Sequence, residues 1–398
     1  MNTSLHALRG SNATLVKAQN LSSVLIAIHH LQPVSRTDLA AKLNLTAATL
    51  TNLVGELTSL GFVEETQSPH RQIGRRPRLL TLNPATAHFV GVEISRTRVQ
   101  ALYVDLGGTI HGRVTCPLPA QQPGRFVLQT TIDAVRAVTE GRPPIVGIGV
   151  GVPGPIDLER GMVLTPTNFG GWAHVPLTGL LQGEFGVPVF IDDDARTAAL
   201  GEHALGAGQH VPNMLYVSLG KGIGSGLILN GSLYRGTHGL AGEIGHTVLD
   251  VRGPRCDCGN HGCLETLASI PAVLQRARDV GLSVDGIEQL LKAATGGNAA
   301  AATVLEDTRT YLSAALVSAV NFCDPDLIVV GGALVQAWPG LVPRLGASVR
   351  GHSFQQVSSD VQIVASATGE DAAALGAATL VQQHVLLRPD VVRGVTRS

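Results

Sequence analysis

The chain has 398 residues and a mass of 41.4 kDa, so we expect two or three domains rather than one hydrophobic core. Hydrophobic residues make up 44% and charged residues 15%, a composition that excludes an intrinsically disordered protein. The formal net charge of −1 excludes a polybasic chain, and no uninterrupted apolar run is long enough for a transmembrane helix. Residues 1–10 lack the apolar core of a signal peptide, and we therefore expect a cytoplasmic protein with reduced thiols.

The charges are divided unevenly along the chain. Residues 1–84 contain eight basic and four acidic residues, a net charge of +4, and the remainder carries −5. This division suggests that one end of the chain meets a polyanion, although chance can also produce a difference of so few charges. Composition leaves both explanations open, so the pattern of residues has to decide between them.

Residues 1–84 have the pattern of three helices followed by a β-hairpin. Apolar residues recur at helical spacing in each helical stretch, and Ser35 and Thr46 are suitable N-caps for the second and third helices. The runs 62–66 and 78–82 have the composition of strands. Two short helices joined by a tight turn and followed by a hairpin indicate a winged helix-turn-helix domain, an α+β unit that binds DNA.

The third helix of such a domain enters the major groove by its N-terminal end, while the hairpin lies near phosphates or a narrow minor groove. The expected DNA contacts are Arg36, Thr46, Ala48, Thr49, Thr51, Asn52, Arg75 and Arg76. A three-helix module that binds a protein instead of DNA is the alternative. The four arginines between positions 71 and 78 argue against it, because a protein-binding module has little need for such a cluster.

From residue 87 onward, short apolar runs broken by glycines alternate with helical stretches. This alternation predicts α/β lobes with ligand-binding crevices at the ends of the strands. The 47 glycines are expected to serve turns and close approaches of the backbone. The segment Asp105-Leu-Gly-Gly-Thr109 is interpreted as the turn of a hairpin, although a motif search would mistake it for a phosphate loop.

Three of the five cysteines, Cys256, Cys258 and Cys263, fall within eight positions and are separated by glycines that let a short loop curl. His246, ten residues upstream, is the expected fourth ligand of a tetrahedral Zn²⁺ site. A disulfide is the poorer alternative, because the cytoplasm disfavours it and one thiol would stay unpaired. Four protein ligands leave no position for a substrate, so the Zn²⁺ is expected to be structural and to order the loop that carries Glu265.

Four motifs make the chain similar to the ROK family, which joins bacterial sugar repressors with sugar kinases. They are Gly147–Asp157 (GIGVGVPGPID), Gly220–Gly226 (GKGIGSG), Ala241–His246 (AGEIGH) and Cys256–Glu265 (CDCGNHGCLE). The resemblance spans essentially the whole chain and implies two α/β lobes of the actin-like, hexokinase-like ATPase fold. Lobe 1 is expected at 85–194, completed by a C-terminal helix at about 383–398, and lobe 2 with the zinc loop at 195–382. Repressors of the family carry a winged helix-turn-helix domain in front of the lobes, and kinases do not.

The resemblance also implies a sugar site. Its expected residues are Asn168, Asp193, Asp194, Glu243, His246 and Glu265. Asp193 stands where the family has asparagine, which leaves the preferred sugar open. Asp192, the first of three consecutive aspartates, is expected only to supply negative charge at a helix N-terminus.

A sugar kinase needs two glycine-rich phosphate loops and an aspartate that accepts the hydroxyl proton. Asp194 stands at the position of that base, and the second loop is largely present, although the role of its Lys221 is unexplained. Where the family's kinases have Asp-x-Gly-Gly-Thr, this chain reads Glu93-Ile94-Ser95-Arg96-Thr97. Ser95 and Arg96 place side chains where a phosphate needs bare backbone, so we expect no catalytic residue and no enzyme activity beyond a residual one.

The sequence therefore predicts a sugar-responsive DNA-binding transcriptional regulator, in its simplest form a repressor, of genes for carbohydrate uptake or metabolism. Its expected partners are palindromic operator DNA, a sugar or sugar phosphate, and further copies of the chain in a homodimer or homotetramer, with no membrane. One alternative is an ATP-dependent, glucokinase-like sugar kinase with an appended DNA-binding module. The other is a sugar-binding module that regulates a protein partner through the N-terminal helices.

Overall fold

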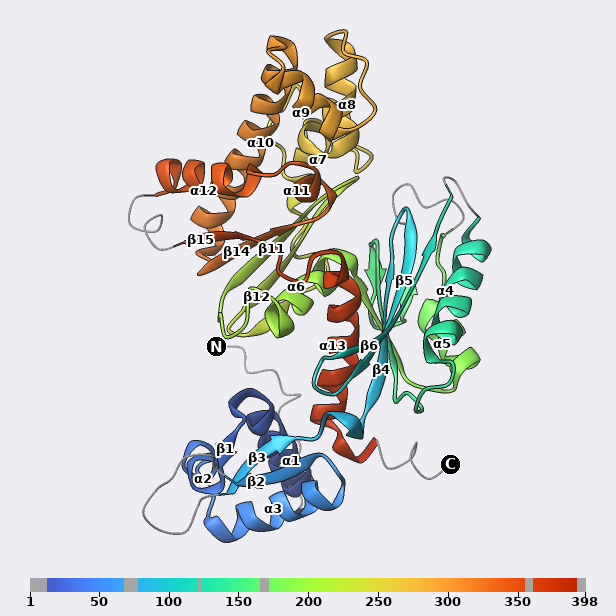
Figure 1. The fold of residues 1–398 in the computed structure, drawn as a ribbon, viewed down its shortest axis with the longest axis vertical. Coiled ribbons are helices and arrows are strands. Elements are labelled where there is room, and N and C mark those ends of the chain that lie inside the picture. Colours follow the sequence, from blue (N-terminus) through green and yellow to red (C-terminus); the bar gives the residue numbers. More distant parts are fainter. Residues whose placement is uncertain (1–12, 68–77, 120–122, 165–171, 355–360, 392–398) are drawn as a thin grey trace.

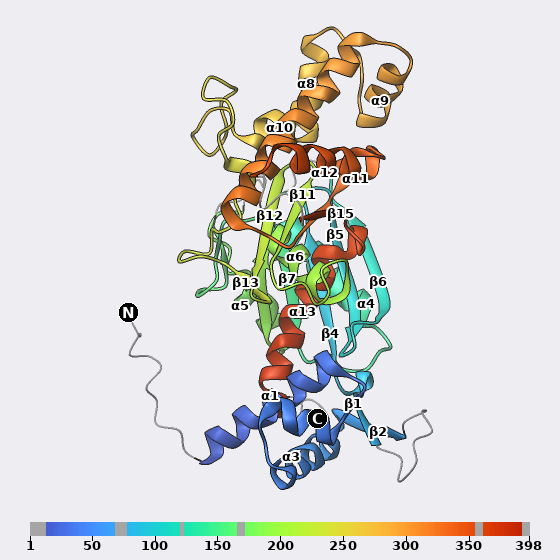
Figure 2. The same cartoon turned by 90° about the vertical axis from the view of Figure 1, so that its left-hand side faces the viewer.

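The computed structural model describes residues 13–67, 78–119, 123–164, 172–354 and 361–391 (Figure 1). A small N-terminal domain lies at one end of the molecule, and two α/β lobes lie beyond it, as the perpendicular view also shows (Figure 2). None of the helices in these segments combines the length and the apolar character that crossing a bilayer requires.

The N-terminal domain is a winged helix-turn-helix. Its elements are α1 (Ala13–Leu31), β1 (Val34–Ser35), α2 (Arg36–Leu43), α3 (Ala47–Ser59), β2 (Val63–Gln67) and β3 (Arg78–Leu82), with the strands in the order β1-β3-β2. The Ser35 side chain accepts a hydrogen bond from the Asp38 amide, and that of Thr46 accepts one from the Thr49 amide. Both predicted N-caps are therefore confirmed, and they fix where α2 and α3 begin.

Lobe 1 is built on a five-stranded sheet in the order β10-β7-β4-β5-β6. Its strands are β4 (His88–Ile94), β5 (Arg98–Asp105), β6 (Ile110–Pro117), β7 (Ile148–Val152) and β10 (Val189–Asp193), with a small hairpin of β8 (Ile156–Asp157) and β9 (Met162–Val163). Helices α4 (Gly124–Thr139) and α5 (Leu177–Phe185) cover one face of the sheet, and α13 (Ala372–Leu387) packs against the other (Figure 1). The Asp105 carboxylate accepts hydrogen bonds from the amides of Gly107 and Thr109, which confirms the predicted hairpin turn.

Lobe 2 is also built on a five-stranded sheet, with the strands in the order β13-β12-β11-β14-β15. Its strands are β11 (Met214–Leu219), β12 (Ile223–Leu229), β13 (Ser232–Tyr234), β14 (Leu327–Gly331) and β15 (Gln362–Ala365). Helix α6 (Asp194–Leu205) packs on one face of this sheet. The other helices are α7 (Leu264–Ala268), α8 (Ile270–Asp279), α9 (Ile287–Thr295), α10 (Ala299–Cys323), α11 (Ala333–Ala337) and α12 (Leu341–His352).

Glycines allow α13 to lie unusually close to its neighbours. An added Cβ at Gly91 in β4 would lie 2.0 Å from the Ala374 carbonyl oxygen, and one at Gly149 in β7 would lie 1.8 Å from that of Ala377. Where α13 crosses α6, a Cβ at Gly376 would lie 1.6 Å from the Thr197 carbonyl oxygen. The expectation that glycines serve close backbone approaches is therefore confirmed at the junction of the two lobes.

Helix α13 also corrects the sequence analysis, because a C-terminal helix at about 383–398 is wrong. The helix runs from Ala372 to Leu387 and ends just before Pro389, whose ring disfavours a helical conformation at the preceding residue. Residues 392–398 lie outside the described residues. The C-terminal end of α13 packs against α1, where the Ser22 hydroxyl donates to the Leu386 carbonyl at 3.1 Å, so one helix contacts the sheet of lobe 1, α6 and the DNA-binding domain.

Candidate functional site

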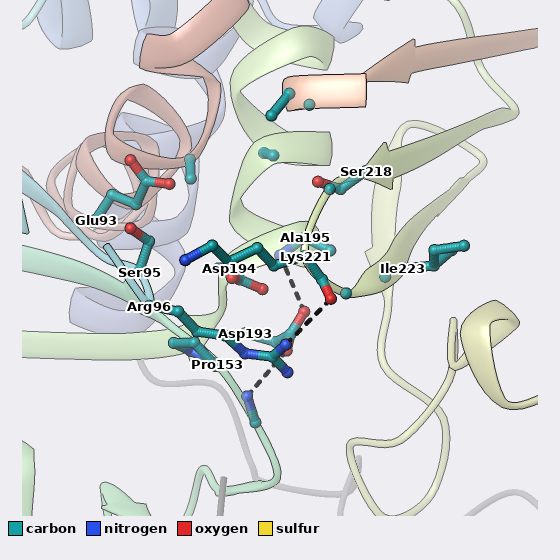
Figure 3. Close-up of a pocket in the computed structure, with 18 of the residues that line it drawn as sticks. Glu93, Ser95, Arg96, Pro153, Asp193, Asp194, Ala195, Ser218, Lys221 and Ile223 are labelled. Atoms are coloured by element: carbon teal, nitrogen blue, oxygen red, sulfur yellow. Dashed lines mark hydrogen bonds between the residues drawn. The ribbon is translucent and has the colours of Figure 1, made fainter. Parts of the chain in front are cut away.

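A cleft of about 830 Å³ lies between the two lobes, within the size range of small-molecule sites (Figure 3). The β4–β5 turn of lobe 1 and the β11–β12 turn of lobe 2 face each other across it. Five of the residues predicted to bind sugar line the cleft: Asp193, Asp194, Glu243, His246 and Glu265. The sixth, Asn168, lies outside the described residues.

The three consecutive aspartates have three different environments. Asp192 is buried, and its carboxylate forms ion pairs with two arginines. One oxygen lies 2.6 Å from Arg196 Nε, and the other lies 2.7 Å from Arg235 Nε. The interpretation of Asp192 as charge at a helix N-terminus is therefore wrong. Strand β10 continues to Asp193, and it is Asp193 that caps α6, accepting from the amides of Ala195 and Arg196. The sequence does not signal this difference, because β10 runs two residues beyond Ile191, its last apolar residue.

Asp194 is the first residue of α6 and faces the cleft (Figure 3). Burial, reinforced by the negative charges of Asp193 and Glu93, raises its pKa to about 8. The carboxyl group therefore holds a proton at neutral pH. A carboxyl group with a pKa near neutral can donate a hydrogen bond to a ligand and can also exchange a proton with it.

The remaining acidic side chains of the cleft come from lobe 2. Glu265, on α7, accepts a hydrogen bond from the Ile223 amide at 2.9 Å, which ties α7 to the β11–β12 turn. Burial and the neighbouring Asp193 raise the pKa of Glu243, which precedes the short 3₁₀ turn that carries His246. These groups present acceptors and donors from several elements to one cavity, the arrangement that sugar hydroxyls require.

The predicted metal ligands form one cluster. The side-chain ligand atoms of His246, Cys256, Cys258 and Cys263 all lie within 4.8 Å of one another. Cys256 Sγ is 3.5 Å from His246 Nδ1, and Cys258 Sγ is 3.6 Å from Cys263 Sγ. A tetrahedral Zn²⁺ with bonds of about 2.0–2.3 Å separates its ligand atoms by about 3.5–3.8 Å, so the four residues fit the ion.

The first phosphate loop is filled by the side chain of Ser95. Its hydroxyl accepts from the amides of Thr97 at 3.4 Å and Arg98 at 3.2 Å, and donates to the Arg98 carbonyl at 3.1 Å. These backbone N–H groups are thus already bonded within the turn. Glycine at position 95 would leave them free for a phosphate, as in the kinase motif.

Sequence reasoning missed one part of the site, the ion pairs of Arg98. Its guanidinium binds Glu93 at 3.0 Å and Glu370 at 2.7 Å, and all three residues line the cleft. Glu370 lies in the short 3₁₀ helix Gly369–Asp371 just before α13, 272 residues from Arg98. No local pattern in the sequence signals a contact over such a separation.

The predicted DNA contacts lie at the N-terminal end of α3 and beside it. Thr46, Ala48, Thr51 and Asn52 are exposed and Thr49 is half-buried. The Arg36 guanidinium binds the Glu65 carboxylate, so this side chain already has a partner within the domain. Arg75 and Arg76 lie outside the described residues.

Comparisons with known proteins identify families for two parts of the chain. Residues 89–384 match the ROK family model, and residues 19–70 match that of the MarR family. The xylose repressor of Bacillus spizizenii is 30% identical, over 96% of this chain and 99% of the repressor. The glucokinase of Halalkalibacterium halodurans is 32% identical over 95% of its own length but only 74% of this chain.

A solved structure resembles nearly the whole molecule. It is a ROK-family transcriptional regulator described as a homologue of the E. coli MLC protein, with a TM-score of 0.82 and 27% identity over 95% of this chain and all of that one. Both predicted architectures, the winged helix-turn-helix domain and the two actin-like, hexokinase-like lobes, are confirmed. The chain belongs to the ROK family, and it carries the MarR-like DNA-binding domain in front of the two lobes.

Proposed function

We propose that the protein is a sugar-responsive transcriptional repressor of carbohydrate genes, which binds operator DNA through the winged helix-turn-helix domain. The observation that carries the proposal is a DNA-binding domain joined to a sugar-type cleft in which Ser95 fills the first phosphate loop. Similarity to a xylose repressor along the whole chain supports it. A homodimer or homotetramer is part of the proposal, because two-fold symmetry matches a palindromic operator.

In this proposal the exposed side chains of α3 contact the major groove, and Arg75 and Arg76 contact the minor groove or phosphates. Each phosphate that an arginine neutralises contributes about −0.9 to the slope of log affinity against log salt concentration. The double substitution Arg75→Ala and Arg76→Ala is therefore expected to weaken binding at low salt and to reduce the slope by about 2.

Fluorescence anisotropy with the DNA upstream of the protein's own gene measures both quantities. Arg278→Ala is a matched control, because Arg278 is an exposed arginine on α8 at the opposite end of the molecule from α3 (Figure 1). Binding that does not depend on salt would show that the domain does not read DNA and would favour a protein partner.

Zn²⁺ is proposed as a structural ion held by His246, Cys256, Cys258 and Cys263. Burial and the neighbouring thiols raise the pKa of Cys263 to about 12, so a bound cation is what would hold all three sulfurs as thiolates. The ion would connect the loop before Glu265 to the 3₁₀ turn of His246, and both residues line the cleft. Its role would be to fix these two side chains in place.

Cys258→Ser is expected to lower the metal content from about one Zn²⁺ per chain to near none after dialysis against a chelator, because three ligands hold the ion much less tightly than four. Emission spectrometry of the purified protein measures the content. His261→Asn, an exposed histidine in the same loop but outside the cluster, should retain the metal. Full metal content in Cys258→Ser would refute the assignment.

A sugar kinase with an appended DNA-binding module is the second candidate, favoured by the similarity to a glucokinase. The filled first loop opposes it. A coupled assay of ADP release with a panel of sugars separates the two functions. Steady turnover that Asp194→Asn abolishes would establish the kinase.

A further inference from the structure

Two basic side chains of the cleft, Arg96 and Lys221, have no role in the site described so far. Arg96 lies in the β4–β5 turn of lobe 1 and Lys221 in the β11–β12 turn of lobe 2. Arg96 extends toward lobe 2, where its Nη1 donates to the Lys221 carbonyl at 3.3 Å, and the Lys221 side chain extends back toward lobe 1 (Figure 3). The two turns thus each contribute a basic side chain to the same cleft.

Within the described part of the chain, the other arginines near the cleft form salt bridges with carboxylates, whereas Arg96 and Lys221 do not. Arg98 is paired with Glu93 and Glu370, and Arg196 and Arg235 are paired with Asp192. Among the described residues, neither Arg96 nor Lys221 forms a salt bridge. Unpaired cations that line one concave site favour an anionic ligand, and arginine and lysine side chains both bind phosphate.

A nucleotide is a poor occupant of this position. The amides of Thr97 and Arg98, which would hold a triphosphate, are bonded to Ser95. The Arg96 guanidinium lies across the gap between the loops, with both terminal nitrogens 3.5 Å from the point where a Cβ on Gly222 would stand. Ser95 and Arg96 therefore obstruct a triphosphate between the two loops.

The same cleft carries the groups expected to bind sugar hydroxyls. Asp193, Glu243, His246 and Glu265 line it together with Arg96 and Lys221. Asp194 also lines the cleft, and its carboxyl group interacts electrostatically with Arg96. Burial raises the pKa of Asp194 to about 8, which weakens the repulsion between this carboxyl group and a phosphate.

We propose that Arg96 and Lys221 bind the phosphate of a phosphorylated sugar, so that the effector is a sugar phosphate and not the free sugar. The inference rests on the proposed function, because it assumes that the cleft binds a sugar. It assigns Lys221 a role and turns the altered phosphate loop into an anion subsite. The substitutions that removed the nucleotide would then have created the selectivity for the effector.

Isothermal titration calorimetry with matched pairs of ligands tests the proposal. The probes are glucose, N-acetylglucosamine and mannose, each compared with its 6-phosphate, together with inorganic phosphate and a non-hydrolysable ATP analogue. At least one 6-phosphate is expected to bind tenfold or more tightly than its free sugar, as hydrogen bonds between charged groups allow. Arg96→Gln and Lys221→Gln are each expected to reduce this ratio about tenfold, whereas Arg136→Gln, on the exposed side of α4, should leave it unchanged.

The ratio within one matched pair cancels any general loosening of the cleft, so a merely structural role of either residue would not change it. Free sugars that bind as tightly as their phosphates would overturn the phosphate subsite and leave the sugar-responsive regulator intact. A preference for the phosphate that survives both substitutions would also overturn it, as would an ATP analogue that binds through the same two residues. Failure of every sugar and every sugar phosphate to bind would overturn both proposals.

Discussion

Replacing Gly376 with alanine is expected to destabilise the protein by about 3 kcal/mol or more, although alanine is the better helix former by about 1 kcal/mol. The added Cβ would lie 1.6 Å from the Thr197 carbonyl oxygen and 2.7 Å from the Gly201 amide nitrogen. Both atoms belong to the backbone of α6, so neither can rotate away as a side chain would. The two helices would have to separate at the junction of the lobes.

Urea denaturation measures the effect, and Gly183→Ala is the matched control. Gly183 also lies inside a helix, α5, but an added Cβ there meets nothing within 4 Å. This control is expected to gain up to about 1 kcal/mol from helix propensity alone. Equal stabilities of Gly376→Ala and the unaltered protein would show that α6 and α13 are not in close contact.

Asp194→Asn is expected to stabilise the protein at pH 8 and to have little effect at pH 4. The folded chain holds the Asp194 proton up to a pKa of about 8, whereas an unfolded chain loses it near 3.9. Between these values the folded state binds more protons than the unfolded state, so the stability that the proton provides is complete below pH 4 and is lost as pH rises through 8.

Asparagine at position 194 does not titrate, so Asp194→Asn does not lose stability in this way as pH rises. One pKa unit corresponds to about 1.4 kcal/mol, so the advantage of Asp194→Asn at pH 8 is expected to be on the order of a few kcal/mol. Thermal denaturation of both proteins across pH 4 to 9 measures it. A difference in stability that stays constant over this range would contradict the raised pKa.

Helix α13 connects the cleft to the DNA-binding domain. Ala372 and Ala373, at its N-terminal end, line the cleft, and Leu386, at its other end, accepts the hydrogen bond of Ser22 on α1. A single hydrophobic cluster also joins the core of the winged helix-turn-helix domain to β4, β5 and α13. This packed helix of 16 residues is therefore the element through which we expect a change in the cleft to reach α1.

The sequence predicted the elements whose signals are local. Ser35 and Thr46 carry the hydroxyls that cap α2 and α3, and the three-cysteine loop contains its own spacing signal. Helix α13 was misplaced because 13 of its residues are buried, from Ala372 to Leu386, so it has no polar face to give a helical period. Its position is determined by contacts with glycines in β4, β7 and α6, which are distant in sequence.

In the cleft, too, the sequence predicted only what local motifs signal. The motifs identified carboxylates that line the cleft, but the different roles of Asp192 and Asp193 depend on where β10 ends. Similarly, only the fold brings Glu370 to Arg98 and Arg96 to Lys221. Such contacts between lobes depend on the packing of whole domains and leave no trace in a local pattern.

The most direct test of the account measures operator affinity with and without ligand in the cleft. Fluorescence anisotropy would follow binding to the upstream DNA at fixed salt, at a ligand concentration that calorimetry shows to be saturating. The account predicts that the ligand changes the dissociation constant for DNA at least about fivefold, the lower end of typical allosteric couplings. An unchanged dissociation constant with the cleft fully occupied would contradict it.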